Sequence, residues 1–192
     1  MRNNLDLYYW YSIRDRFGNL KRSRKRVARS FLTAFITGLY LRAVSGSTIN
    51  RTDTGGTSRA LQKTTLFNVD TPSGTSTEGL VVGTGTTAPT ITDSKLQTQI
   101  AHGVGSGQLQ YAASVVNVPT SDATSTSVIL TRDFTNGSGG TITIQEIGIY
   151  AEMNYGAAGN SLSQFCIVRD LATISLTNGA LLTLNYELKT TA

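Results

Sequence analysis

Acidic side chains are the groups in this chain of 192 residues that come nearest to a catalytic set. Four of them fall in or near neighbouring predicted strands: Glu146, Glu152, Asp133 and Asp170. Two carboxyl groups that face one cleft could perform the acid and base steps of glycoside hydrolysis. Because Arg132 and Arg169 lie on the same predicted strands, we expect instead that these acids form ion pairs at the surface or rim.

The sequence lacks the usual residues for metal or nucleophilic chemistry. It contains one His, His102, and one Cys, Cys166, which rules out a cluster of His and Cys ligands and an intramolecular disulfide. Cys166 lies in the apolar run Phe165–Val168, which predicts a buried and unreactive thiol. Residues 83–88 match the loose dinucleotide pattern GxGxxA, but Pro89 stops the helix that this pattern needs, so we interpret them as a loop. We predict no catalytic residues, no metal and no cofactor.

Basic residues are concentrated near the N-terminus. Residues 1–63 contain 13 Lys/Arg and 3 Asp/Glu, whereas residues 64–192 contain 4 and 9. The densest part comprises Lys21, Arg22, Arg24, Lys25, Arg26 and Arg29. Such a run could contact phosphates, which require only positive charge and reach, or an acidic surface on another protein or another copy of the chain. No aromatic residues are interleaved within it to stack on bases, so we favour a protein partner over DNA.

The basic run leads into an apolar segment with helical spacing. Four residues recur at four-residue intervals and predict a helix over 27–44: Val27, Phe31, Phe35 and Leu39. Such an apolar helix must cover its surface, against the β-rich part of the chain or against the same helix in other copies. We therefore add Phe31, Phe35 and Leu39 to the six basic residues as predicted partner-binding residues. A membrane span is not expected, because Arg29 and Arg42 interrupt the segment.

Most of the remaining sequence alternates between apolar and polar residues, as strands do. The central stretch is Thr141–Tyr150, in which the parity of the apolar residues switches at Gln145–Glu146. An extra residue at that point would restore one apolar face, so we predict a β-bulge there. We expect this strand to form a hairpin with Val128–Phe134. Asn178-Gly179 predicts a second hairpin, between residues 172–176 and 182–188.

These elements predict a mainly β fold. We expect an antiparallel β-sandwich, jelly-roll-like, with an N-terminal hairpin and one long apolar helix. The hairpin is predicted from Leu7–Ile13 and a second strand that starts near Leu20, and a short helix is predicted at Ser94–His102. Residues 1–63 would form a basic arm with hairpin, helix and linker, and residues 64–192 would form the sandwich.

Several strings between residues 79 and 188 resemble the β-rich structural proteins of tailed-bacteriophage virions. They are Gly79–Pro89 (GLVVGTGTTAP) followed by Asp93 and Leu96, Ile142–Tyr150 (ITIQEIGIY), Val168–Leu171 (VRDL) and the closing LTLNYEL. Similar strings occur in tail-fibre, collar or neck, and capsid-associated proteins. The resemblance implies a virion component and carries no catalytic signature.

We therefore expect a non-enzymatic virion structural protein. It would form homo-oligomers, such as a trimer or a larger ring, and attach to another virion component at the capsid, neck or tail. Two alternatives stay open. A β-sandwich that recognises host glycans would expose aromatic side chains beside loop carboxylates, and a neck or packaging protein would contact DNA through the basic run.

Overall fold

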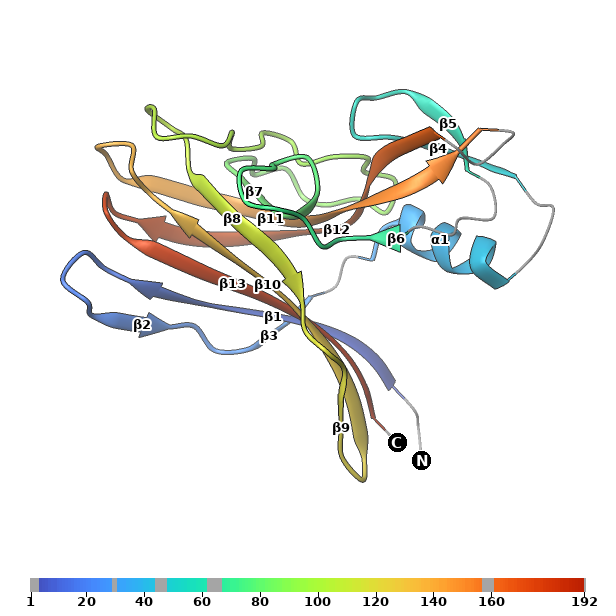
Figure 1. Ribbon diagram of the computed structural model, residues 1–192, viewed down its shortest axis with the longest axis horizontal. Helices are drawn as coiled ribbons and strands as arrows, with labels where there is room; N and C mark the ends of the chain where they lie inside the picture. The colour runs from blue at the N-terminus through green and yellow to red at the C-terminus, as the bar shows by residue number, and fades with distance from the viewer. Residues whose placement is uncertain (1–3, 29–30, 44–47, 62–66, 157–160, 192) are drawn as a thin grey trace.

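The computed structural model describes residues 4–28, 31–43, 48–61, 67–156 and 161–191. Two antiparallel sheets pack face to face, and the described residues contain a single helix (Figure 1). The predicted β-sandwich is therefore confirmed.

The first sheet, sheet A, brings the two ends of the chain together. Its strands are β1 (Asn4–Arg14), β2 (Leu20–Arg22), β3 (Arg26–Ala28), β8 (Gln110–Val116), β9 (Thr120–Ser121), β10 (Ser125–Thr135) and β13 (Leu181–Thr191). The order is β2-β1-β13-β10-β8, with β3 also paired to β1 and β9 to β10. Strand β1 pairs with β13 along its whole length, so both termini lie at the same end of the molecule (Figure 1). The predicted N-terminal hairpin is present as β1 and β2.

The second sheet, sheet B, is built around one long strand. Its members are β4 (Ile49–Thr52), β5 (Ser58–Leu61), β6 (Phe67–Asn68), β7 (Gly79–Gly83), β11 (Ile142–Tyr155) and β12 (Ser161–Leu176). The order is β12-β11-β5-β4, and β6 and β7 also pair with β11. The β11–β12 register shifts between Ile144 and Glu146, which confirms the bulge predicted from the change of parity.

Both predicted C-terminal hairpins are wrong, because the paired segments belong to different sheets. β10 lies in sheet A and β11 in sheet B, and β12 and β13 are separated in the same way. The two turns cross between the sheets and are tied together by Asn136, which is fully buried. Its amide donates to Gly140 O at 2.8 Å and to Leu176 O at 2.7 Å, and Gly179 N donates to Asn136 O at 2.7 Å. The strands therefore face each other across the core instead of pairing edge to edge.

The helix α1 (Thr33–Ala43) is shorter than the helix predicted over 27–44. Residues 26–28 form β3 instead, where Ala28 pairs with Leu7 and is buried. The prediction was wrong at this end because strand pairing buries Ala28 and keeps the preceding cations away from the positive end of the helix dipole.

The predicted division into an arm of residues 1–63 and a sandwich of residues 64–192 stays a prediction. Strand pairing nevertheless joins the two segments. β1 lies beside β13 in sheet A, and β5 pairs with β11 in sheet B. Arg29 and Val44, which were assigned to the basic run and the helix, lie outside the described residues.

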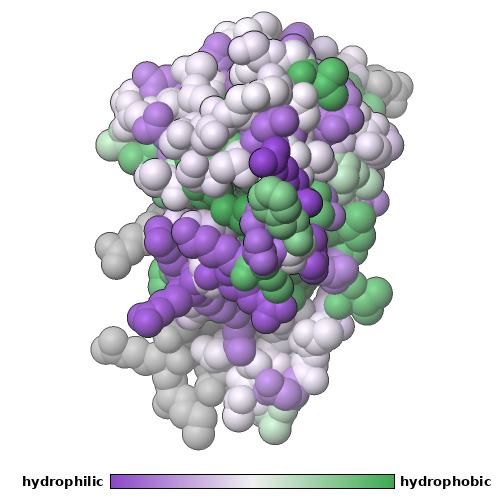
Figure 2. Space-filling view, turned by 90° about the vertical axis from the view of Figure 1, so that its left-hand side faces the viewer, coloured by the Kyte–Doolittle hydropathy of each residue, from purple (hydrophilic) through white to green (hydrophobic). Residues whose placement is uncertain are grey.

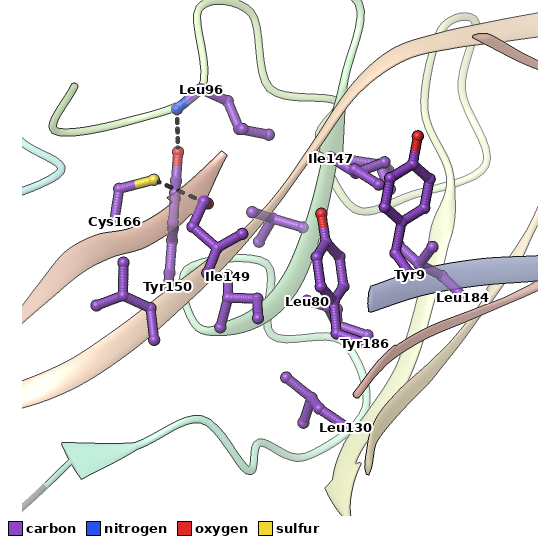
Figure 3. Close-up of a cluster of buried hydrophobic side chains, with 14 of the residues drawn as sticks. Tyr9, Leu80, Leu96, Leu130, Ile147, Ile149, Tyr150, Cys166, Leu184 and Tyr186 are labelled. Atoms are coloured by element: carbon purple, nitrogen blue, oxygen red, sulfur yellow. Dashed lines mark hydrogen bonds between the residues drawn. The ribbon is translucent and has the colours of Figure 1, made fainter. Parts of the chain in front are cut away.

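The core lies between the sheets. Figure 3 shows side chains from both sheets that meet there, including Leu80, Ile147 and Ile149 from sheet B and Leu130, Leu184 and Tyr186 from sheet A. Helix α1 packs against β12. Gly38 allows the helix to approach β6 closely, since a Cβ at this position would lie 2.5 Å from the Phe67 ring.

Candidate functional site

Three charged residues meet in a buried ion network beside the bulge of β11. Arg169 of β12 donates through Nε to Glu146 Oε2 at 2.9 Å and through Nη1 to Asp93 Oδ2 at 2.6 Å. Its Nη2 donates to Thr87 O at 2.9 Å. The Arg169 and Glu146 side chains are only 3% and 0% exposed. The expected pair of Glu146 with Arg169 is therefore present, but it lies inside the protein and not at the rim.

Backbone groups complete the coordination of Glu146. Its Oε1 accepts hydrogen bonds from Gly85 N at 3.0 Å and Thr98 N at 2.7 Å, and its Oε2 accepts one from Gln97 N at 2.9 Å. Together with Arg169, these donors occupy about as many acceptor sites as a carboxylate offers. We call Glu146, Arg169, Asp93 and their backbone partners the buried clamp.

The loop over β11 contains no helix, so the helix predicted at Ser94–His102 is wrong. Thr84 N donates to Thr98 O at 2.8 Å, and Ile100 N donates to Val82 O at 2.9 Å. This part of the loop therefore runs beside the end of β7, with its backbone groups used between the two segments. Leu96 N donates to Tyr150 Oη at 2.7 Å and fixes the start of the same segment (Figure 3).

The clamp is electrostatically stable in its charged form. Burial alone would raise the pKa of Asp93, but hydrogen bonds from Thr90 and Arg169 outweigh it and lower the pKa below its ordinary value. Burial would also lower the pKa of Arg169, yet its bonds to Asp93 and Glu146 raise it. Each charge is thus held by its partners. The arrangement fixes the loop to sheet B and presents no unoccupied carboxylate oxygen of Glu146 to a substrate.

Arg132, the second arginine that was expected to pair with an acid, instead binds backbone carbonyl groups. It is 1% exposed and donates to Ala112 O, Glu78 O, Leu80 O and Thr75 O. Its guanidinium carbon lies 4.8 Å from the centre of the Tyr111 ring. Burial lowers the pKa of Arg132 to about 10. This side chain joins the loop before β7 to sheet A.

Two further chemical candidates, Asp170 and Cys166, are also placed in structural positions. The Tyr186 hydroxyl donates to Asp170 Oδ2 at 2.9 Å, which links β13 to β12 across the core. Cys166 is buried, burial raises the pKa of its thiol, and its Sγ lies 3.4 Å from Val168 O. Within the described ranges, no group of three or more His, Cys, Asp or Glu side chains could hold a metal ion.

Five of the six predicted basic residues lie along the edge of sheet A and are exposed: Lys21, Arg22, Arg24, Lys25 and Arg26. Lys25 pairs with Glu187 of β13. The other four have no ion pair with any residue that the structure describes. Figure 2, which views the end of the molecule where the β1–β2 turn lies, shows strongly hydrophilic residues gathered across the middle of this face.

Two of the three predicted apolar partner residues, Phe31 and Phe35, lie beside a cleft between the sheets. This cleft has a volume of about 170 Å³ and almost entirely apolar walls. Phe31 and Phe35 line it and stack on each other with ring centres 4.2 Å apart, and Phe35 is 7% exposed. Leu39 instead points outward from α1 and is 46% exposed.

Sequence reasoning missed the opposite wall of the cleft. It comes from sheet A and includes Val116, Val128 and Leu188. Alternation predicted Leu188 on an apolar face, but in residues 109–115 it placed Val115 and not Val116 in the apolar row. The register of β8 and β10 shifts between Arg132 and Phe134, which the sequence did not reveal.

Comparison of the chain with protein-family models, curated proteins and solved structures gives no match. Among the helical residues that the structure describes, none form a helix long and apolar enough to cross a membrane.

Proposed function

We propose that the protein is a non-enzymatic structural component of a tailed-bacteriophage virion that forms homo-oligomers and attaches to another virion component. Support comes from the strings that resemble such proteins. Gly85 and Thr87 of GTGTTAP, Glu146 of ITIQEIGIY and Arg169 of VRDL all contribute to the buried clamp. In this chain the strings therefore hold a loop against a sheet, which is a structural task.

The observation that carries the proposal is the outward face of α1. Ile36, Leu39 and Tyr40 are 58%, 46% and 47% exposed. Their spacing places them on one side of the helix, while Ala34, Phe35 and Leu41 are buried on the other. A helix that is apolar on both sides is expected to be covered on both sides in the assembled protein.

A second copy of the chain is the partner that fits this face best. The face carries no carboxylate, and α1 contains one charged residue, Arg42. Two such faces can meet without burying charged side chains against each other. A twofold contact uses the same patch on both copies.

The mass of the full chain in solution tests the oligomeric part of the proposal. Light scattering after gel filtration should give a multiple of 20.5 kDa. Leu39→Asp should shift the protein to the monomer without changing its circular dichroism, because the side chain is exposed. Val104→Asp is a matched control, since Val104 is 59% exposed and lies in the loop before β8. A wild type that is monomeric at the concentrations used would contradict this contact.

Location tests the virion part. Mass spectrometry of purified virions from the phage that encodes the chain should detect it at many copies per particle, and density maps should place it at the capsid, neck or tail. Its absence from purified particles would contradict the proposal. Strong binding on a glycan array would favour the host-recognition alternative instead.

A further inference from the structure

The outer face of sheet A carries two aromatic side chains that take no part in the core. Tyr8 and Trp10 alternate along β1 with the buried residues Leu7 and Tyr9, so they project to the side away from sheet B. Both are half-buried and lie outside the core cluster. Trp10 is the only tryptophan in the chain.

Strand pairing brings the basic run to these aromatic rings. Arg22 is paired with Ser12, two residues along β1 from Trp10, and therefore projects to the same face. Lys25 Nζ lies 4.9 Å from the centre of the Tyr8 ring and 5.1 Å from that of Trp10. The sequence separates the aromatic residues from the cations, but the sheet places them side by side.

Among the five basic residues at this edge, Lys25 alone has an acidic partner within the described chain, Glu187 of β13. Residues 4–28 contain seven Lys/Arg and two Asp/Glu. Both acids are engaged locally: Asp6 accepts a hydrogen bond from the Tyr8 hydroxyl, and Asp15 accepts bonds from Phe17 N and Asn19 N. Four exposed cations have no ion pair with the described residues: Lys21, Arg22, Arg24 and Arg26. Arg22 shares the face of Trp10, whereas Lys21 and Arg26 are paired with Ile13 and Tyr9 and project to the other face at this edge.

We propose that the outer face of β1, β2 and β3 binds single-stranded nucleic acid. Arg22, Arg24 and Lys25 contact phosphates, and one or two bases stack on Trp10 and Tyr8. To do so, Lys25 leaves the two rings and its ion pair with Glu187. The stretch of β1 from Tyr8 to Arg14 spans about 20 Å, which suits a short site like the smallest of about four nucleotides on known single-strand-binding folds. This inference concerns a different surface from the proposed oligomer contact and does not depend on it.

Aromatic rings on the solvent side of the sheet are the feature that favours a single strand. Every base has a π-face, so stacking accepts any sequence, whereas a duplex keeps its bases stacked inside. An acidic protein partner would use the cations but would have no need of the two rings. Single-stranded DNA and RNA offer the same phosphates and bases to this surface, and the experiment distinguishes them.

The test follows Trp10 fluorescence and the anisotropy of a labelled strand. The full-length protein is titrated with oligothymidylate, with oligouridylate and with duplex DNA, each of about 12 nucleotides per strand. Single strands should quench Trp10 and bind more tightly than the duplex, and the tighter of the two single strands identifies the natural chemistry. With about three phosphate contacts, log K should fall with log salt at a slope of about −2.

Variants separate stacking from charge. Trp10→Leu should weaken binding of the single strand at least about fivefold, measured by anisotropy. Arg22→Gln should make the salt slope shallower by about 0.7, whereas Lys95→Gln, an exposed cation in the loop over β11, should change neither. Circular dichroism confirms that each variant is folded. Equal binding of duplex and single strand without Trp10 quenching would overturn the proposal, and so would the absence of binding at low salt.

Discussion

Glu146 is a fully buried carboxylate whose partners come from three separate parts of the chain. Glu146→Gln would remove its charge and leave Arg169 with Asp93 as its single ionic partner. Because the substitution removes one of the two carboxylates that hold a buried charge, we expect a loss of about 3 kcal/mol in the free energy of unfolding. Urea denaturation measures it. Asp70→Asn is the control, since Asp70 is exposed and should change stability by less than about 0.5 kcal/mol.

The Cys166 thiol should be unreactive in the native protein. It is 1% exposed, and burial raises the pKa of the thiol, so the reactive thiolate is disfavoured. Ellman's reagent should label about none of the protein in buffer and one thiol per chain in concentrated guanidinium chloride. Rapid labelling of the native protein at neutral pH would contradict the buried placement.

The sequence predicted these residue environments only in part. The sequence predicted that acids such as Glu146 would form ion pairs with Arg132 and Arg169. The buried thiol was predicted from its apolar neighbours. The burial of the pair was not predicted, because the groups that make it tolerable are the backbone N–H groups of Gly85, Gln97 and Thr98. Any residue supplies such a group, so no residue type marks it in a sequence.

Among the elements, β11 shows how far a pattern of alternation can be taken. Its bulge was predicted because the parity of the isoleucines changes. Its pairing with β10 was predicted wrongly, because the glycine-rich turn at residues 136–140 indicates a reversal of the chain. It does not indicate whether the returning strand pairs in the same sheet or crosses to the opposite one. Here the inward apolar rows, such as Phe134 in β10 and Ile144 in β11, are buried by facing each other across the core.

Gly148 lies where β11 is covered on both sides. A Cβ at this position would lie 2.8 Å from Val168 O and 2.9 Å from Leu96 Cδ2. Gly148→Ala should therefore push the loop or β12 away and lower the free energy of unfolding by about 1–3 kcal/mol. Gly140→Ala is the matched control, because a Cβ there would meet nothing within 4 Å. Equal urea midpoints for the two variants would show that the loop does not press on the strand.

At the scale of the whole molecule, folding increases the contrast in exposed charge between the basic residues 1–63 and the acidic residues 64–192. Of the four cations after residue 63, Arg132 and Arg169 are buried and serve the fold. Most exposed positive charge of the described chain therefore belongs to the edge of sheet A. The sequence predicted a partner for this charge, but it could not place Tyr8 and Trp10 beside it, because strand pairing and not sequence distance brings them together.

Two carboxylates join distant segments and should make the whole fold sensitive to acid. Burial would raise the pKa of both, but hydrogen bonds outweigh it and lower both pKa values below 3.8. Asp53 receives bonds from Arg59 at 2.7 Å and Ser163 at 2.9 Å, and Asp93 is held by Arg169. When the pH falls through the ordinary pKa of a carboxyl group toward its lowered native pKa, the unfolded chain binds more protons than the native protein. The free energy of unfolding therefore falls as the pH falls.

The urea midpoint of the wild type should accordingly change little between pH 7 and pH 5 and decrease below about pH 4 as these carboxylates are protonated. Glu152 acts in the opposite direction, since burial raises its pKa above 4.5. Its protonation should make the first part of the decrease in the urea midpoint smaller. A double variant, Asp53→Asn with Asp93→Asn, should be less stable than the wild type at pH 7 but lose less stability between pH 5 and pH 3. If both proteins lose the same amount over that interval, the acid sensitivity arises from other groups.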